Sequence, residues 1–139
     1  MNADLAAQHA MDRCAEVGFE GLTESDRTLA TVWQFASGVG NGGFKGYFAS
    51  SRGDLAFHAP AALHAIHALA LATIAADANR LFGPDGPPKN ISERRARIDE
   101  IAANRTQDLR SLDDRYFACE EDVDELLEKF LQSSDRPHA

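Results

Sequence analysis

The chain has 139 residues, of which 22 are acidic and 14 are basic, so its formal net charge at neutral pH is −8. This length fits a single domain, residues 1–139, with a real core, and a hydrophobic content of 44% is ordinary for a globular protein. The negative charge argues against direct binding to nucleic acids or anionic membranes, and it suits a basic protein partner.

The two cysteines, Cys14 and Cys119, are too few for a disulfide scaffold and lack C-x-x-C spacing. We therefore expect free thiols in a reducing compartment. The first residues are not basic and lead into no apolar segment, so no signal peptide is expected. The most apolar stretch, 55–76, is interrupted by three histidines, and no segment reaches the roughly 18 apolar residues of a membrane span. These features predict a cytoplasmic protein.

The N-terminal part predicts two helices. Residues 3–17 are rich in alanine and carry a loose apolar stripe. Thr23, with Asp26 three positions later, resembles a capping box that begins the second helix. We expect this helix to end at Gly38 and Gly40, because glycine accepts the backbone conformation of a helix exit. Its core-facing residues are predicted to be Leu29, Val32, Trp33, Ala36 and Val39.

A glycine-dense turn at 38–43 follows, and Asn41 can cap a short helix placed at about 42–50. Aromatic side chains three and four positions apart share one face of this short helix. Asp54 is then predicted to cap a long alanine-rich helix over 55–76. Pro60 either kinks this helix or marks its restart. The long helix is apolar nearly all round and is therefore expected to be central and buried.

In the C-terminal part, two glycines and three prolines make 82–88 a loop. A basic helix is predicted at 91–103. Ser111 and Asp114 predict a cap that opens a short helix through Cys119, and the last helix covers 120–132. Residues 133–139 are expected to form a frayed tail. No convincing strand is present, so the sequence predicts an all-α bundle of about six or seven helices.

The usual patterns of an active site give weak signals. The segment 38–43 matches G-x-G-x-x-G, but a predicted helix precedes it and no acidic residue follows at the ribose-binding position. We interpret this segment as a tight turn. His58, His64 and His67 do not share one helical face, and nearby residues complete no ligand set. No nucleophile elbow is present. We expect no metal, no cofactor and no catalytic residue.

The strongest charge feature is an acidic block near the C-terminus, opposed only by Arg115 and Lys129. Helical residues four apart rise about 6 Å, a scale similar to the separation of successive phosphates on a nucleic-acid strand. The block therefore predicts a phosphate-like face for a basic DNA-binding partner. The alternative is the solvated face of an amphipathic helix. The residues of the block are Asp113, Asp114, Glu120, Glu121, Asp122, Asp124, Glu125 and Glu128.

Several short motifs occur in a fixed order between about residues 33 and 131. The main one is an NGGF…YF…GD pattern, carried by Asn41, Gly42, Gly43, Phe44, Tyr47, Phe48, Gly53 and Asp54. Others are Ala62-Leu63 with Ile66, Leu112-Asp113, Tyr116-Phe117, Glu121-Asp122-Val123 and Leu126-Leu127. Together these motifs resemble a bacterial family of DNA-mimic-like proteins.

The resemblance implies an all-α fold that is often dimeric. For the best-known member it implies surface carboxylates that imitate DNA phosphates and engage a DNA-binding transcription factor. The NGGF…YF…GD residues are expected to be structural, since caps, a glycine turn and an aromatic face explain them. The chain departs from the family pattern at three positions: Gly46 replaces a glutamine, Ser50 an asparagine and His67 a glycine.

Two classes of function follow, and we favour the first. A binding protein, as a homodimer, would use the acidic face to occupy a basic DNA-binding protein. A small-ligand protein or an enzyme would instead have a pocket between Asn41 and His64, formed by Tyr47, Ser50, Ser51, Asp54 and His58. An immunity or antitoxin-like partner shares the binding logic of the first class with a different target.

Overall fold

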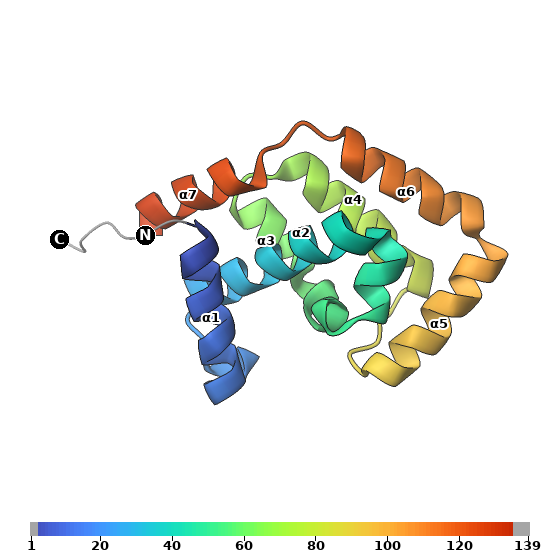
Figure 1. Ribbon diagram of the computed structural model, residues 1–139, viewed down its shortest axis with the longest axis horizontal. Coiled ribbons are helices and arrows are strands. Elements are labelled where there is room, and N and C mark those ends of the chain that lie inside the picture. The colour runs from blue at the N-terminus through green and yellow to red at the C-terminus, as the bar shows by residue number, and fades with distance from the viewer. Residues whose placement is uncertain (1–2, 135–139) are drawn as a thin grey trace.

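The computed structural model describes residues 3–134, in which every regular element is a helix, as the sequence predicts (Figure 1). Seven α-helices are present in this part of the chain: α1 (Ala3–Val17), α2 (Glu24–Ala49), α3 (Ala59–Ala65), α4 (Leu69–Asn79), α5 (Ile91–Asn104), α6 (Thr106–Ala118) and α7 (Val123–Ser134). Three 3-10 helices join them: η1 (Phe19–Gly21), η2 (Ser51–His58) and η3 (Arg80–Phe82).

Two of the N-terminal predictions, the bounds of the first helix and the Thr23 cap, are confirmed because their signals are local. The first helix has the predicted bounds, and the Thr23 hydroxyl accepts a hydrogen bond from the backbone N–H of Asp26 at 3.2 Å. Of the residues predicted to face the core, Leu29, Val32 and Val39 are buried, whereas Trp33 and Ala36 are half-buried.

Helix α2 is longer than predicted and is the central element of the fold. It continues through Gly38 and Gly40, and the chain breaks from helical geometry only at Gly43, where φ is 67° and ψ is −174°. Gly38 serves packing rather than a helix exit, because a Cβ atom there would lie 2.5 Å from Tyr47 Cδ1. Figure 1 shows α2 crossing the middle of the molecule, and it contacts α1, α3, α5, α6 and α7.

The predicted long helix over 55–76 is wrong. This stretch is divided into η2, α3 and α4, and Pro60 lies in the first turn of α3, where its missing N–H costs nothing. The second interruption is at Ile66–Ala68, where His67 adopts a φ of 67°. Asp54 does not cap a helix but lies within η2. Of the two interruptions, the one before α3 agrees with the expected restart near Pro60, and the one at 66–68 was not predicted. The expected burial is observed only in part, since His64, His67 and Leu69 are exposed.

The C-terminal part follows the prediction with two corrections. The loop after η3 and the helix α5 lie where expected, and Ile98 and Ile101 of α5 are buried. Helix α6 begins at Thr106, so Ser111 lies inside it rather than at a cap. Helix α7 begins at Val123 and includes Ser133 and Ser134; the rest of the expected frayed tail, 135–139, lies outside the described residues.

The arginines of α5 serve the fold rather than forming a free basic surface. Arg94 is fully buried and its guanidinium makes five hydrogen bonds. Its acceptors are the carbonyl oxygens of Phe48, Ser50, Pro88 and Lys89 and one carboxylate oxygen of Asp54, at 2.7–3.1 Å. Arg95 donates to the carbonyl of Ala49, and Arg97 donates to that of Phe82. Since the last carbonyls of a helix lack partners, Arg94 and Arg95 together cap the end of α2.

Arg94→Met should lower the free energy of unfolding by about 3–5 kcal/mol, because it leaves buried carbonyls and the Asp54 carboxylate without their donor. Urea unfolding followed by circular dichroism measures this loss. Arg95→Met is the matched control, because its exposed side chain makes one comparable hydrogen bond, and it should cost about 1 kcal/mol or less. Equal losses in the two variants would contradict the assignment of Arg94 as the organising residue.

His67→Gly should raise the free energy of unfolding by up to about 1 kcal/mol. The left-handed conformation costs an L-residue about 1–2 kcal/mol, whereas glycine adopts it freely and loses about 0.5–1 kcal/mol through chain entropy. His64→Gly, inside α3, should instead destabilise the protein by about 0.5–1 kcal/mol. Thermal and urea unfolding of the two variants check this difference in sign, and the same sign in both would refute it.

Candidate functional site

The acidic block lies along one edge of the molecule, where α6 and α7 follow one another (Figure 1). Asp113 and Asp114 belong to α6, the residues from Glu120 to Asp122 form the connection, and the remaining three belong to α7. Sequence neighbours within the block have different environments, so each carboxylate must be considered by its own contacts.

Asp113 is used inside the fold. It is half-buried, and its Oδ1 accepts a hydrogen bond from the backbone N–H of Phe44 at 2.8 Å. That N–H follows the break at Gly43, so Asp113 caps the second part of α2, the role that the sequence assigned to Asn41. A Cβ at Gly43 would lie 2.9 Å from Asp113 Oδ2, so both space and backbone conformation require glycine there. Asn41 itself is exposed.

Glu121 is also committed to an internal contact. Its two carboxylate oxygens accept hydrogen bonds from the backbone N–H groups of Ala70 and Leu71, at 3.1 and 2.8 Å, in the first turn of α4. A carboxylate at a helix N-terminus satisfies unpaired donors and opposes the positive end of the helix dipole. Glu121 precedes α7, so it is not part of a helical row with the acidic residues of that helix.

Two further residues of the acidic block, Asp122 and Glu125, have close partners on α7. Asp122 Oδ1 accepts from the backbone N–H of Glu125 at 3.1 Å and so caps the helix. The Glu125 carboxylate lies 3.1 Å from the ammonium of Lys129. Exposed pairs of this kind contribute little to stability, yet they neutralise charge locally.

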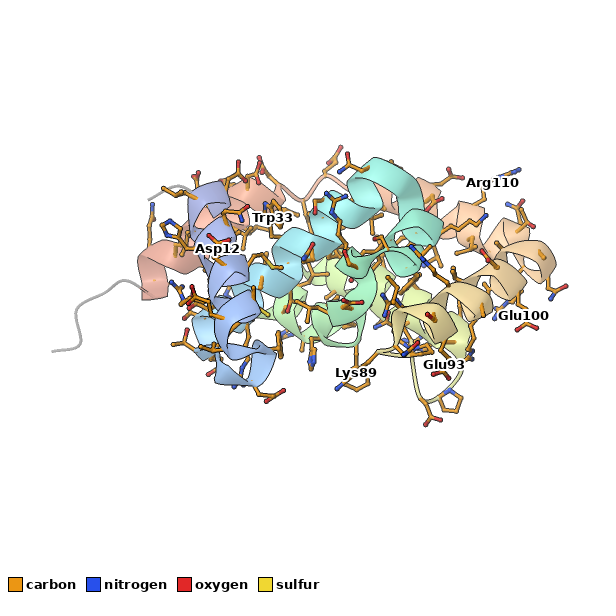
Figure 2. The ribbon with its side chains drawn as sticks, turned by 60° about the horizontal axis from the view of Figure 1, so that its bottom comes forward. Asp12, Trp33, Lys89, Glu93, Glu100 and Arg110 are labelled. Atoms are coloured by element: carbon orange, nitrogen blue, oxygen red, sulfur yellow. The ribbon has the colours of Figure 1, made fainter. Side chains whose placement is uncertain are left out.

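Four carboxylates remain that are exposed and form no ion pair or side-chain hydrogen bond with other residues of 3–134. We call them the exposed acidic set: Asp114, Glu120, Asp124 and Glu128. The corner between α5 and α6, beyond this set, has mixed charge, since Glu100 and Arg110 both project outward there (Figure 2). Arg115 is engaged with Asp77 of α4 at 2.9 Å. The arrangement offers a localised negative surface over the α6–α7 edge.

The aromatic residues of the NGGF…YF…GD pattern form the centre of the core. Phe44, Tyr47 and Phe48 are at most 1% exposed, and Phe44 and Tyr47 pack against Phe35. The Tyr47 hydroxyl has no hydrogen-bond partner among the described residues, and burial raises the pKa of this phenol well above its usual range. The remaining motif position with a strict steric demand is Gly53, where a Cβ would lie 2.6 Å from the Tyr47 carbonyl oxygen.

The expected pocket between Asn41 and His64 is not assembled by these side chains. Tyr47 is buried, and Asp54 is bound to Arg94. His58 instead stacks on Phe19, with ring centroids 4.5 Å apart, and burial lowers the pKa of its imidazole.

Within the described residues, no three His, Cys, Asp or Glu side chains gather closely enough to hold a metal ion. None of the helices in this part of the chain has the length and apolarity needed to cross a bilayer.

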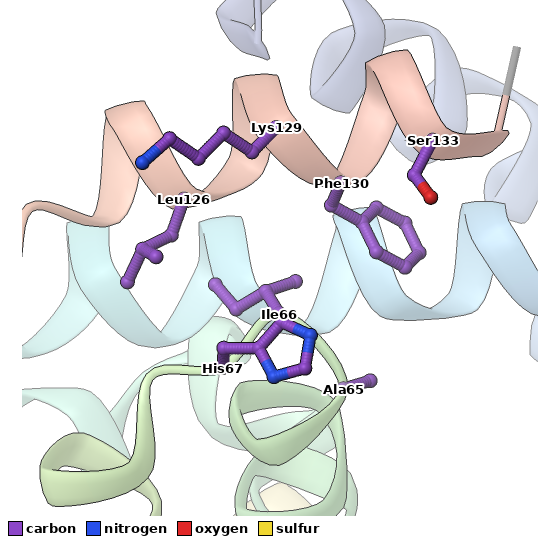
Figure 3. A pocket seen from close by; sticks show the side chains of 7 residues that line it. All are labelled: Ala65, Ile66, His67, Leu126, Lys129, Phe130 and Ser133. Atoms are coloured by element: carbon purple, nitrogen blue, oxygen red, sulfur yellow. The ribbon is translucent and has the colours of Figure 1, made fainter.

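A different pocket of about 350 Å³ lies between the α3–α4 turn and α7 (Figure 3). We call it the α7 pocket. His67 faces Phe130 across it, and Ile66 and Leu126 supply apolar walls. This pocket could not be predicted from the sequence, because its residues come from segments about 60 positions apart.

The geometry defines an all-α protein with four exposed carboxylates on the α6–α7 edge that form no ion pair or side-chain hydrogen bond within residues 3–134. The sequence profile of the family described as DMP19-like protein matches residues 20–134, and the chain belongs to this family. Comparisons with curated proteins and with solved structures gave no match. The resemblance inferred from the motifs is therefore confirmed at the level of the family.

The sequence did not predict the structural roles of Arg94, Asp113 and Glu121, although the two carboxylates were expected in the acidic face. Each binds backbone groups 44–69 residues away along the chain, apart from the nearby carbonyls of Pro88 and Lys89. A usable signal exists for Asp113, since a helix break at a glycine leaves N–H groups that need an acceptor. The break at a glycine indicates that an acceptor is needed, but it does not indicate which residue supplies that acceptor.

Asp113→Ala should lower the free energy of unfolding by about 1–2 kcal/mol, because it removes the cap of the second part of α2. Asp114→Ala, at the neighbouring exposed position, should change it by less than about 0.5 kcal/mol. Urea unfolding of the two variants makes the comparison. If Asp113→Ala changed the free energy of unfolding as little as Asp114→Ala, the hydrogen bond from Phe44 would not contribute to stability.

Proposed function

We propose that the protein is a DNA mimic that uses the exposed acidic set to occupy the DNA-binding surface of a basic protein. The single observation that carries the proposal is the localised group of unpaired carboxylates on the α6–α7 edge of a DMP19-like family member. Membership supports the class of activity, and the unpaired state of these four side chains supports their role. A DNA-binding surface lined with Lys and Arg would find there the charges it normally finds on phosphates.

The spacing within the set suits this role. Asp124 and Glu128 are four residues apart on α7 and so rise about 6 Å along it, similar to the separation of successive phosphates. Asp114 and Glu120 extend the negative surface from α7 toward α6. Asp113 and Glu121, which the sequence had placed in the same face, support the surface from within rather than contacting the partner.

The family resemblance also implies a homodimer, and we retain this as part of the proposal. Leu69 on α4 and Phe117 on α6 are large apolar residues that are 53% and 61% exposed, which is suitable material for an interface. Light scattering of the purified protein determines the oligomeric state. An immunity or antitoxin-like role would use the same acidic surface, and the identity of the captured partner distinguishes it from DNA mimicry.

The first test is capture of partners from host lysate at low and high salt, with bound proteins identified by mass. We expect a basic DNA-binding protein that is released by high salt and displaced by duplex DNA, because both compete for the same charged surface. A partner whose binding is insensitive to duplex DNA would contradict the proposal.

The exposed acidic set is then tested with the identified partner. Changing Asp114 and Asp124 to Asn, and Glu120 and Glu128 to Gln, should reduce affinity by at least about tenfold, since several charge contacts are lost. The matched control removes four exposed, unpaired carboxylates from other parts of the surface: Glu16→Gln, Asp85→Asn, Asp99→Asn and Glu100→Gln. Both variants change the net charge from −8 to −4, so long-range electrostatics are equal. Equal affinities of the two variants would show that the position of the charges is irrelevant.

A further inference from the structure

We propose that the α7 pocket binds a small carboxylate with an apolar body, independently of the acidic surface. The pocket has a volume of about 350 Å³ and is lined by Ala65, Ile66, His67, Leu126, Lys129, Phe130 and Ser133. This size lies at the lower end of the range for small-molecule sites, which are mostly apolar with a few polar groups.

The walls supply an apolar and partly aromatic surface. Ile66 is 1% exposed and belongs to the core, and Leu126 and Phe130 are half-buried against it. Figure 3 shows the Phe130 ring directed toward the space above His67 and Ile66. A planar or branched apolar group of a few carbon atoms would displace water from this surface and gain hydrophobic contact with it.

His67 is the feature that separates this pocket from an incidental hollow. Its φ of 67° is left-handed, a conformation that glycine adopts freely and that is unfavourable for an L-residue. The imidazole is exposed and lies in the pocket, facing Phe130 (Figure 3). Unfavourable backbone conformations that persist in a fold tend to cluster at functional sites. Here the conformation places a hydrogen-bonding ring next to an apolar wall.

The other polar groups of the pocket favour an anionic ligand. Lys129 lies at one end of the pocket and Ser133 at the other (Figure 3). The Lys129 ammonium pairs with Glu125 at 3.1 Å, but the two side chains are 67% and 60% exposed, so this pair is weak and can exchange. The Lys129 ammonium and the Ser133 hydroxyl are therefore at opposite ends, and a carboxylate can accept a hydrogen bond from the donor at its own end and from the His67 imidazole N–H between them.

The pocket and the exposed acidic set lie on different sides of α7. Leu126, Lys129, Phe130 and Ser133 follow the i, i+3, i+4, i+7 spacing of one helix side. At 100° per residue, Asp124 and Glu128 lie roughly opposite that side. Ligand binding in the pocket therefore does not rest on the DNA-mimic proposal, and either can fail without the other.

Three probes with the same ring and different charge test the proposal: benzoate, benzyl alcohol and benzylamine. Titrations followed by ¹H–¹⁵N NMR at about 0.15 M salt should show benzoate shifting the resonances of His67, Phe130 and Ser133. Benzoate should bind about tenfold more tightly than benzyl alcohol, the value of one charged hydrogen bond. Because the protein has a net charge of −8, non-specific attraction favours benzylamine, so a preference for benzoate would be specific. Tighter binding of benzylamine than of benzoate would overturn the proposal.

Variants locate the interaction. His67→Gly and Lys129→Met should each weaken benzoate binding about tenfold while leaving benzyl alcohol nearly unchanged, because each removes a polar group and keeps the apolar walls. His64→Ala removes an exposed histidine that does not line the pocket, and it should bind benzoate as the parent does. His67→Gly is expected to fold, and its spectrum verifies this. Unchanged benzoate affinity in both His67→Gly and Lys129→Met would refute the pocket as a carboxylate site.

Discussion

The buried guanidinium of Arg94 is the constraint on which the arrangement of the molecule depends. A buried charge is tolerated only when it is paired and all its donors find acceptors. Arg94 meets this requirement by joining the end of α2, the loop before α5 and the Asp54 carboxylate of η2. The C-terminal carbonyls of α2 need donors for the same reason. One side chain thus satisfies two separate demands, and α2, η2 and α5 are fixed relative to one another.

At the N-termini of helices, carboxylates satisfy the unpaired backbone groups, as the arginines do at the C-terminus of α2. Asp113 caps the second part of α2 after the break at Gly43, and Glu121 caps α4. Both contacts place a negative group at the positive end of a helix dipole, where it also accepts unpaired N–H groups. The fold therefore uses part of the acidic block internally. The number of acidic residues counted along the sequence therefore overstates the number of carboxylates that a partner can contact. The exposed acidic set contains the carboxylates that remain available.

Local features of the fold could be predicted from the sequence, and contacts between distant segments could not. The bounds of α1, the Thr23 cap and the loop after Phe82 depend on neighbours within a few residues. The end of α2 was misplaced because Gly38 was expected to end the helix, whereas it lies inside the helix and leaves room for the Tyr47 ring. Within 55–76, the restart at Pro60 was one of two expected outcomes, whereas the break at His67 was missed because the apolar pattern continues through it. At the site, the acidic residues were visible in the sequence, but their partners, up to 69 residues away, were not.

The capping carboxylates Asp113 and Glu121 matter for the proposed function because they help to position the exposed acidic set. A surface that imitates phosphates needs fixed spacing, since ordering mobile side chains and loops on binding reduces affinity. Glu121 ties the α6–α7 connection to α4, and Asp122 begins α7 immediately after it. The register of Asp124 and Glu128 therefore depends on Glu121, although the Glu121 carboxylate is directed to α4. The same contact positions Leu126 and Phe130 against His67, so the contact of Glu121 with α4 affects both sides of α7.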